Sequence, residues 1–161
     1  MLGLLATADN IFSKDTFPGH FTASAWILNH DVSHVLLTLH AEIKRWFQLG
    51  GHFEASDRSL AEACHREATE ESGIVDLDKN RAFIIDLDIH PIPGNTKHEP
   101  HLHYDISMCF LAKPSAEISR SSESRDLKWI SLSKVKSLTQ DPSVIRMCDK
   151  TEKFKVTGWF Q

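Results

Sequence analysis

The chain alternates between apolar runs of strand length and segments with helical spacing, and this change of pattern predicts the order of its elements. Runs rich in apolar and β-branched residues predict strands at Phe21–His30, His34–His40, Arg45–Phe53, Arg81–Ile92, His101–Lys113 and Leu127–Leu132. The pair Gly50-Gly51 interrupts the third of these strands, and a polar loop joins the fourth to the fifth.

Helices are predicted at Ser59–Ser72, Ser131–Leu138 and Asp141–Phe154. The first is the clearest, because Ser59 and Glu62 form a capping-box pattern at its start. Gly73, followed by the apolar Ile74, suits the left-handed residue that commonly ends a helix. This mixture of elements predicts an α/β or α+β fold in which a few helices pack on a mixed sheet.

The composition narrows the class of protein and of partner. The 161 residues are 41% hydrophobic and 25% charged, which is typical of one globular domain spanning residues 1–161. The net charge of −4 does not favour a nucleic-acid-binding surface. A phosphate-bearing small ligand would therefore need local positive charge, most simply a metal ion.

The cysteines and the longest apolar runs indicate in which cellular compartment the protein is expected. Cys64, Cys109 and Cys148 are too few and too scattered for a disulfide framework, so we expect reduced thiols in a cytoplasmic protein. The opening MLGLLA is short and lacks a basic flank, and no apolar run approaches the ~20 residues of a membrane span. We therefore expect neither a signal peptide nor a membrane segment.

Three carboxylates gather on the first predicted helix. Glu67, Glu70 and Glu71 are related by spacings of three and four residues, which place them on one helical face, where like charges repel. A divalent cation would convert that repulsion into a binding site, and oxygen ligands of this kind suit Mg²⁺ or Mn²⁺. The alternative is a helix face that only contacts water.

The residues around these carboxylates form a longer motif. The stretch REATEESGI, preceded by paired glycines after a strand, closely resembles the Nudix box, which reads Gly, five residues, Glu, seven residues, then Arg-Glu-apolar-x-Glu-Glu-x-Gly-apolar. The second half matches at every specified position: Arg66, Glu67, Ala68, Glu70, Glu71, Gly73 and Ile74. The first half is one residue too long between Gly51 and Arg66, so the early Glu position falls on Arg58, or on Asp57 if the loop carries an insertion.

The resemblance implies an α/β/α sandwich around a mixed sheet and an enzyme that hydrolyses a small-molecule diphosphate. It also implies a set of ligands for Mg²⁺ or Mn²⁺, namely Glu67, Glu70, Glu71 and the backbone carbonyl of Gly51. Arg66 would hold the carboxylates in place by ion pairing. Because Nudix domains often dimerise, a homodimer is one expectation for the assembly.

The resemblance leaves the general base open. Glu70 could act as the base, and so could Glu123, which lies in the loop before the strand at Leu127–Leu132 where many Nudix hydrolases carry one. The alternative for Glu123 is an ordinary loop carboxylate.

Histidines are numerous, at ten in the whole chain. His101, His103 and Asp105 alternate, so on a strand their side chains share one face, and His52 directly follows the paired glycines. We predict that His52, His101 and His103 contact the substrate. A transition-metal site and ordinary packing at the sheet surface are the alternatives.

Two other functions compete with hydrolysis. The segment GGH is similar to the Cys-Gly-His of isopentenyl diphosphate isomerases, Nudix relatives whose metal uses several histidines, but Gly50 replaces the cysteine here. A non-catalytic Nudix-fold module that binds a ligand or regulates is the other alternative, because a fold does not fix a function. The intact set of Glu67, Glu70 and Glu71 favours the enzyme.

Overall fold

The computed structural model describes residues 1, 3, 10–41, 43–94, 99–122 and 124–158. Its strands are β1 (Gly19–Leu28), β2 (His34–His40), β3 (Trp46–Phe47), β4 (Leu49–His52), β5 (Phe83–Ile92), β6 (His101–Leu111) and β7 (Ser124–Ser131). They form a seven-stranded sheet in the order β3-β2-β1-β6-β5, with β4 also paired to β1 and β7 to β2. The β1–β6 pair is parallel and the other pairs are antiparallel, so the sheet is mixed as expected.

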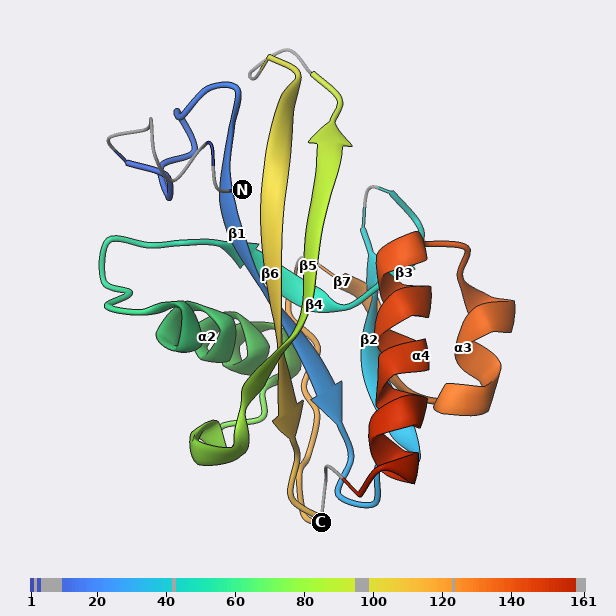
Figure 1. Cartoon of the computed structure of the whole chain (residues 1–161). Helices are drawn as coiled ribbons and strands as arrows, with labels where there is room; N and C mark the ends of the chain where they lie inside the picture. The colour runs from blue at the N-terminus through green and yellow to red at the C-terminus, as the bar shows by residue number, and fades with distance from the viewer. Residues whose placement is uncertain (2, 4–9, 42, 95–98, 123, 159–161) are drawn as a thin grey trace.

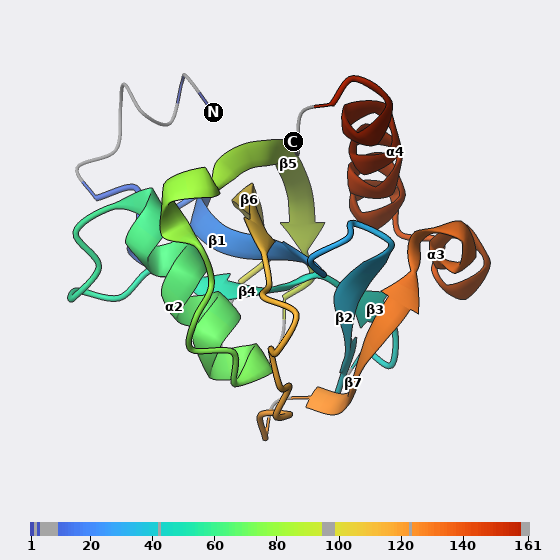
Figure 2. The ribbon, with the colours of Figure 1, turned by 90° about the horizontal axis from the view of Figure 1, so that it is seen from below.

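Helices cover both faces of this sheet (Figures 1 and 2). Helix α2 (Leu60–Ser72) packs on β1 and β4, whereas α4 (Pro142–Val156) packs on β5 and on α3 (Leu132–Leu138). A short 3-10 turn at Lys79–Arg81 precedes β5. The predicted arrangement of helices on either side of a mixed sheet is confirmed.

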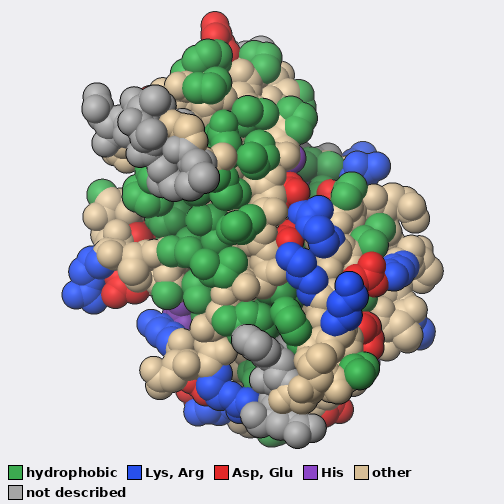
Figure 3. All heavy atoms as spheres, viewed as in Figure 1, with side chains coloured by type: hydrophobic (Ala, Val, Ile, Leu, Met, Phe, Trp, Pro, Cys, Tyr) green, Lys and Arg blue, Asp and Glu red, His purple; other side chains and the backbone are tan. Residues whose placement is uncertain are grey.

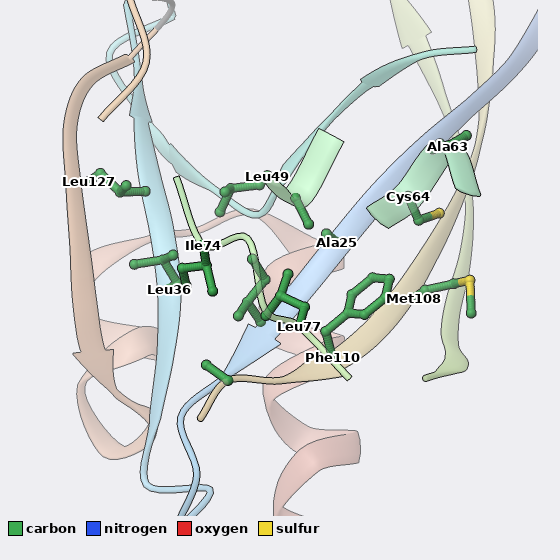
Figure 4. Close-up of a cluster of buried hydrophobic side chains, with 14 residues drawn as sticks. Ala25, Leu36, Leu49, Ala63, Cys64, Ile74, Leu77, Met108, Phe110 and Leu127 are labelled. Carbon is green, nitrogen blue, oxygen red and sulfur yellow. The ribbon is translucent and has the colours of Figure 1, made fainter. Parts of the chain in front are cut away.

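Alternating residues of β1 separate the two halves of the core. On the α2 side, Ala25 and Ile27 join a buried cluster that also contains Ala63 and Cys64 of the helix (Figure 4). On the α4 side, Trp26 is fully buried and its indole N–H donates a 2.9 Å hydrogen bond to the Thr151 hydroxyl. The parity of a β1 residue therefore tells which face of the sheet its side chain occupies.

Both ends of α2 agree with the sequence. The Ser59 hydroxyl accepts a 3.2 Å hydrogen bond from the Glu62 N–H. Gly73 has a φ of 73° and its N–H caps the helix at the Thr69 carbonyl. In a capping box the Glu62 carboxylate would accept a hydrogen bond from the N–H of Ser59. Here it accepts one from the N–H of the preceding residue, Arg58, at 2.9 Å.

Several predicted boundaries were wrong. The third strand breaks at Gln48 and not at the glycines, which lie inside β4. β1 covers Gly19–Leu28, two residues earlier than expected, and Arg81 belongs to the 3-10 turn. β7 begins at Ser124 because it pairs along the whole of β2, so its length follows its partner and not its own apolar run.

An ionic contact attaches α4 to β5. The buried Asp86 carboxylate accepts hydrogen bonds from Arg146 (2.6 and 3.0 Å) and from Lys150 (2.6 Å), and Arg146 also bonds Asp88 at 2.7 Å. Figure 3 shows basic side chains gathered over α4. Burial acts to raise the pKa of Asp86, but the bonds to Arg146 and Lys150 outweigh it, so the pKa lies below its usual value.

Asp86→Asn should lower the free energy of unfolding by roughly 1–3 kcal/mol near neutral pH, because it removes the buried charge to which Arg146 and Lys150 are bonded. The folded pKa of Asp86 is depressed, so its contribution is present above about pH 4 and is lost as the pH falls through the folded pKa. Urea denaturation at pH 7 and at about pH 3 measures both effects. Asp76→Asn, which removes an exposed partner of Lys113, is the control and should change little; equal losses in the two variants would contradict the assignment.

Candidate functional site

The paired glycines bring β4 against the carboxylates of α2. A Cβ atom on Gly51 would lie 2.7–2.8 Å from the Glu67 carboxylate, so a larger residue there would displace that carboxylate. The Gly50 N–H donates a 2.9 Å hydrogen bond to the Glu71 Oε2 atom. Gly50 has a φ of 153°, and a Cβ there would meet the Ser24 hydroxyl at 2.5 Å. At Gly50 the backbone itself requires glycine, because the Ala23 carbonyl oxygen would also lie 2.7 Å from a Cβ atom, whereas at Gly51 glycine keeps the Glu67 carboxylate in its place.

Arg66 forms ion pairs with two of the three carboxylates. Its Nη1 lies 2.9 Å from Glu67 Oε1 and 3.1 Å from Glu70 Oε2. Its Nη2 donates to the His52 carbonyl at 2.8 Å and to Asp57 Oδ2 at 2.9 Å, and its Nε donates to Asp57 Oδ1 at 3.1 Å. The Asp57 carboxylate, followed by Glu67, raises the pKa of Arg66. One guanidinium therefore links the loop, β4 and α2.

Of the two candidates for the early acidic position of the motif, Asp57 and not Arg58 contacts Arg66. The Asp57 side chain is 4% exposed and also accepts the Glu54 N–H at 2.8 Å, while its bond to Arg66 lowers its pKa. The Arg58 side chain is 85% exposed and pairs with Glu62. We therefore expect the additional residue to lie in the loop before α2.

A pocket gathers most of the predicted site residues. Its walls include Gly51, His52, Arg66, Glu67, Glu70 and Glu71. Lys14, Ser121 and Ser122 also line it and carry no motif that would reveal them. Glu123 follows Ser122 in the chain but lies outside the described residues, so its role as a base stays a prediction.

The donors of this pocket fit a hard divalent cation. Glu54 adds a fourth carboxylate to Glu67, Glu70 and Glu71, against the positive charges of Lys14 and Arg66 among the described lining residues. Carboxylate and backbone carbonyl oxygens are the ligands that Mg²⁺ and Mn²⁺ prefer. Gly51 and the three glutamates line the same pocket.

His101 and His103 lie on the other face of the sheet. His20 pairs in register with His103, and His90 pairs with His103 from the opposite side. These rings and that of His52 form the histidine cluster, in which the ring centroids of His20 lie 4.9 Å from His103, 5.1 Å from His101 and 5.2 Å from His52. His20 has the parity of Trp26, so the cluster is on the α4 side, opposite α2, at an end of the sheet that extends beyond both helices (Figure 1).

Asp105 lies next to the histidine cluster on the same face. Its carboxyl is 4% exposed and accepts bonds from Thr22 (2.7 Å), Ser24 (2.9 Å) and Ser107 (3.0 Å). Burial raises the pKa of Asp105. Burial and the neighbouring imidazoles lower the pKa of His103 to about 3, so this ring is neutral at physiological pH.

A comparison with known protein families identifies the family of this chain. The model described as the NUDIX domain matches residues 18–148, which include every strand, the carboxylate helix and both glycines. The chain belongs to the Nudix family. No curated protein matches it.

Solved structures share the Nudix fold. An Ap4A hydrolase from C. elegans aligns with a TM-score of 0.64 at 15% identity, covering 85% of this chain and 98% of that chain. A NUDIX-family hydrolase from Clostridium perfringens aligns at 0.58 and 27% identity, covering 84% and 97%. The NUDIX domain of Shewanella oneidensis NrtR, complexed with ADP ribose, aligns at 0.62 and 18% identity, covering 94% and 96%.

The remaining sequence expectations concern thiols and membranes. The three cysteines are free and buried. Cys64, which lies within the Nudix motif, belongs to the core, and its burial raises the pKa of its thiol to about 12. In the described part of the chain, every helix is too short or too polar to traverse a bilayer.

The two candidates for the early acidic position can be separated by substitution. Asp57→Ala should lower the free energy of unfolding by roughly 1–3 kcal/mol, because it leaves the mostly buried Arg66 guanidinium without its main partner. Arg58→Ala removes an exposed ion pair and should cost no more than about 0.5 kcal/mol. Urea denaturation measures both, and a larger loss at Arg58 would show that the motif is aligned on the wrong residue.

Proposed function

We propose that this Nudix protein is a metal-dependent hydrolase that cleaves the diphosphate linkage of a nucleoside diphosphate-linked or related small molecule. Members of the family hydrolyse pyrophosphate bonds. The observation that carries the proposal is the joint placement of Glu67, Glu70, Glu71 and Arg66 around one pocket against the Gly51 backbone. A helix face that only contacted water would not need a strand so close to it.

Each residue of the pocket has a distinct role in this proposal. Glu67, Glu70, Glu71 and the Gly51 carbonyl would hold Mg²⁺ or Mn²⁺. An ion of this kind neutralises a diphosphate and lowers the pKa of water. Arg66 fixes Glu67 and Glu70 through the bonds described above, so the ligands are ordered before substrate arrives.

The general base is assigned to one of two carboxylates. The Glu70 side chain is 57% exposed and faces the pocket, which suits a group that must take a proton from the attacking water. Glu123 remains the second candidate by its position in the chain. Lys14, on the pocket wall, supplies a positive charge that can pair with a phosphate oxygen.

We assign substrate contact first to His52, which lines the pocket although its ring joins the histidine cluster, so its backbone is the part that would meet the substrate there. His101 and His103 were expected to do the same, but they reach the pocket only through the histidine cluster, where the rings of His52 and His103 are 5.1 Å apart. Their contact would therefore be with a part of the substrate that extends past His52.

A ligand-binding or regulatory module is the second candidate. The observation that favours it is the Shewanella NUDIX domain, whose structure holds ADP ribose. The isomerase is the third and weakest, because Gly50 cannot supply a thiol and the only cysteine near the motif is buried in the core. A homodimer and a cytoplasmic location also remain proposals.

Replacement of the metal-binding carboxylates tests the hydrolase. Glu67→Gln, Glu70→Gln and Glu71→Gln should each lower kcat/KM by about 10²-fold or more, since a metal contribution of several kcal/mol is lost. Glu62→Gln, whose side chain bonds Arg58 away from the pocket, is the matched control and should keep its activity. Full activity in all three variants would contradict the assignment.

A substrate screen separates the enzyme from the binding module. Nucleoside triphosphates, ADP-ribose, Ap4A and coenzyme A are incubated with the chain and Mg²⁺ or Mn²⁺, and phosphate or nucleoside monophosphate release is measured. We expect turnover of at least one compound, and its abolition by chelation of the metal. Binding of ADP-ribose by calorimetry without any turnover would instead support the module.

A further inference from the structure

The histidine cluster is a second group of metal-ligating side chains, apart from the carboxylates. Among the described residues, one ligand atom each from His20, His101 and His103 lies within 4.8 Å of the other two. The Nε2 atoms of His101 and His103 are 3.3 Å apart. A tetrahedral Zn²⁺ site with bonds of about 2.0–2.1 Å has nitrogen atoms roughly 3.3–3.4 Å apart, so this pair already has the separation of two ligands.

The backbone orients one of these rings for coordination. The Glu99 carbonyl lies 2.8 Å from His101 Nδ1, and since a carbonyl can only accept, this nitrogen carries the proton. In the neutral ring Nε2 is then unprotonated, and it is this atom that faces His103. A second-sphere bond of this type, from the far ring nitrogen to a backbone carbonyl, accompanies metal-bound histidines.

The surroundings keep the other two ligands in place. His20 is 1% exposed, on β1, which is paired to β6 over its whole length. His103 lies between His20 and His90 on adjacent strands. The His90 Nδ1 atom lies 3.0 Å from Asp88, which in turn bonds Arg146. The three ligands therefore lie on two strands that are paired with each other, so they need little ordering when an ion binds.

We propose that His20, His101 and His103 form a transition-metal site, selective for an ion such as Zn²⁺ and separate from the carboxylate pocket. Imidazole nitrogens suit Zn²⁺, whereas carboxylate and carbonyl oxygens suit Mg²⁺ and Mn²⁺. Three protein ligands leave a fourth position open, as in zinc sites that bind a water or an anionic ligand. The rings of His52 and His90 lie next to His103.

The two donor sets are on opposite faces of the sheet. Gly51 faces α2 and approaches Glu67, whereas the neighbouring His52 side chain joins the histidine cluster. Loss of one metal should therefore leave the other site intact. This inference goes beyond hydrolysis, because it concerns a different ion and different ligands.

Metal binding is tested on the full chain without an affinity tag. The protein is stripped with a chelator, dialysed against Zn²⁺ and then against metal-free buffer, and its zinc is counted by elemental analysis. We expect about one equivalent of Zn²⁺. In parallel, Co²⁺ should give the intense visible absorption of a tetrahedral site, and Zn²⁺ should raise the Tm, because an ion that binds only the folded state stabilises it.

Variants identify the ligands. His101→Phe keeps a ring but removes the nitrogens, and we expect it and His103→Ala to lower Zn²⁺ affinity by at least tenfold and to abolish the Tm shift. The His101 side chain is partly exposed, so this variant should fold, which its circular dichroism without metal verifies. His30→Ala, an exposed histidine outside the cluster, and Glu70→Gln should both keep the zinc.

Three results would overturn the proposal. They are a wild-type chain that retains no zinc, variants at His101 and His103 that both retain it, and loss of zinc in Glu70→Gln. Since none of these measurements uses a substrate, they are independent of whether Mg²⁺-dependent hydrolysis is found.

Discussion

The close approach of β4 to α2 is the constraint on which the carboxylate pocket depends. With Gly50 and Gly51 the strand backbone comes within hydrogen-bonding distance of Glu71 and leaves room for Glu67. Arg66 then ties the helix to the loop and to the His52 carbonyl. The Gly50 N–H thus fixes Glu71, whereas Arg66 fixes Glu67 and Glu70.

Short-range features of the site were readable from the sequence. The i, i+3, i+4 spacing of Glu67, Glu70 and Glu71, the Ser59 cap and the Gly73 terminus all depend on one helix, so local rules sufficed. The choice between Asp57 and Arg58 needed the path of a loop, which decides which side chain turns toward Arg66.

Features that depend on strands far apart could not be read in this way. The break at Gln48, the early start of β7 and the place of His20 all follow from pairing between distant strands. The alternation of His101, His103 and Asp105 correctly predicted a shared face, but not which face or which neighbours. Glu123 lies outside the described residues, so its assignment still rests on its position in the chain.

The parallel pairing of β1 with β6 has a consequence for the order of folding. Thr22 and Asp105, which bond across this pair, are 83 positions apart in the chain. Contacts of such long range require closure of a large loop and form late, after local turns and helices. The helix carboxylates are brought together by one local element, whereas the imidazoles of β1 and β6 meet only when these two distant strands pair. These imidazoles would therefore bind a metal only late in folding, after the local turns and helices have formed.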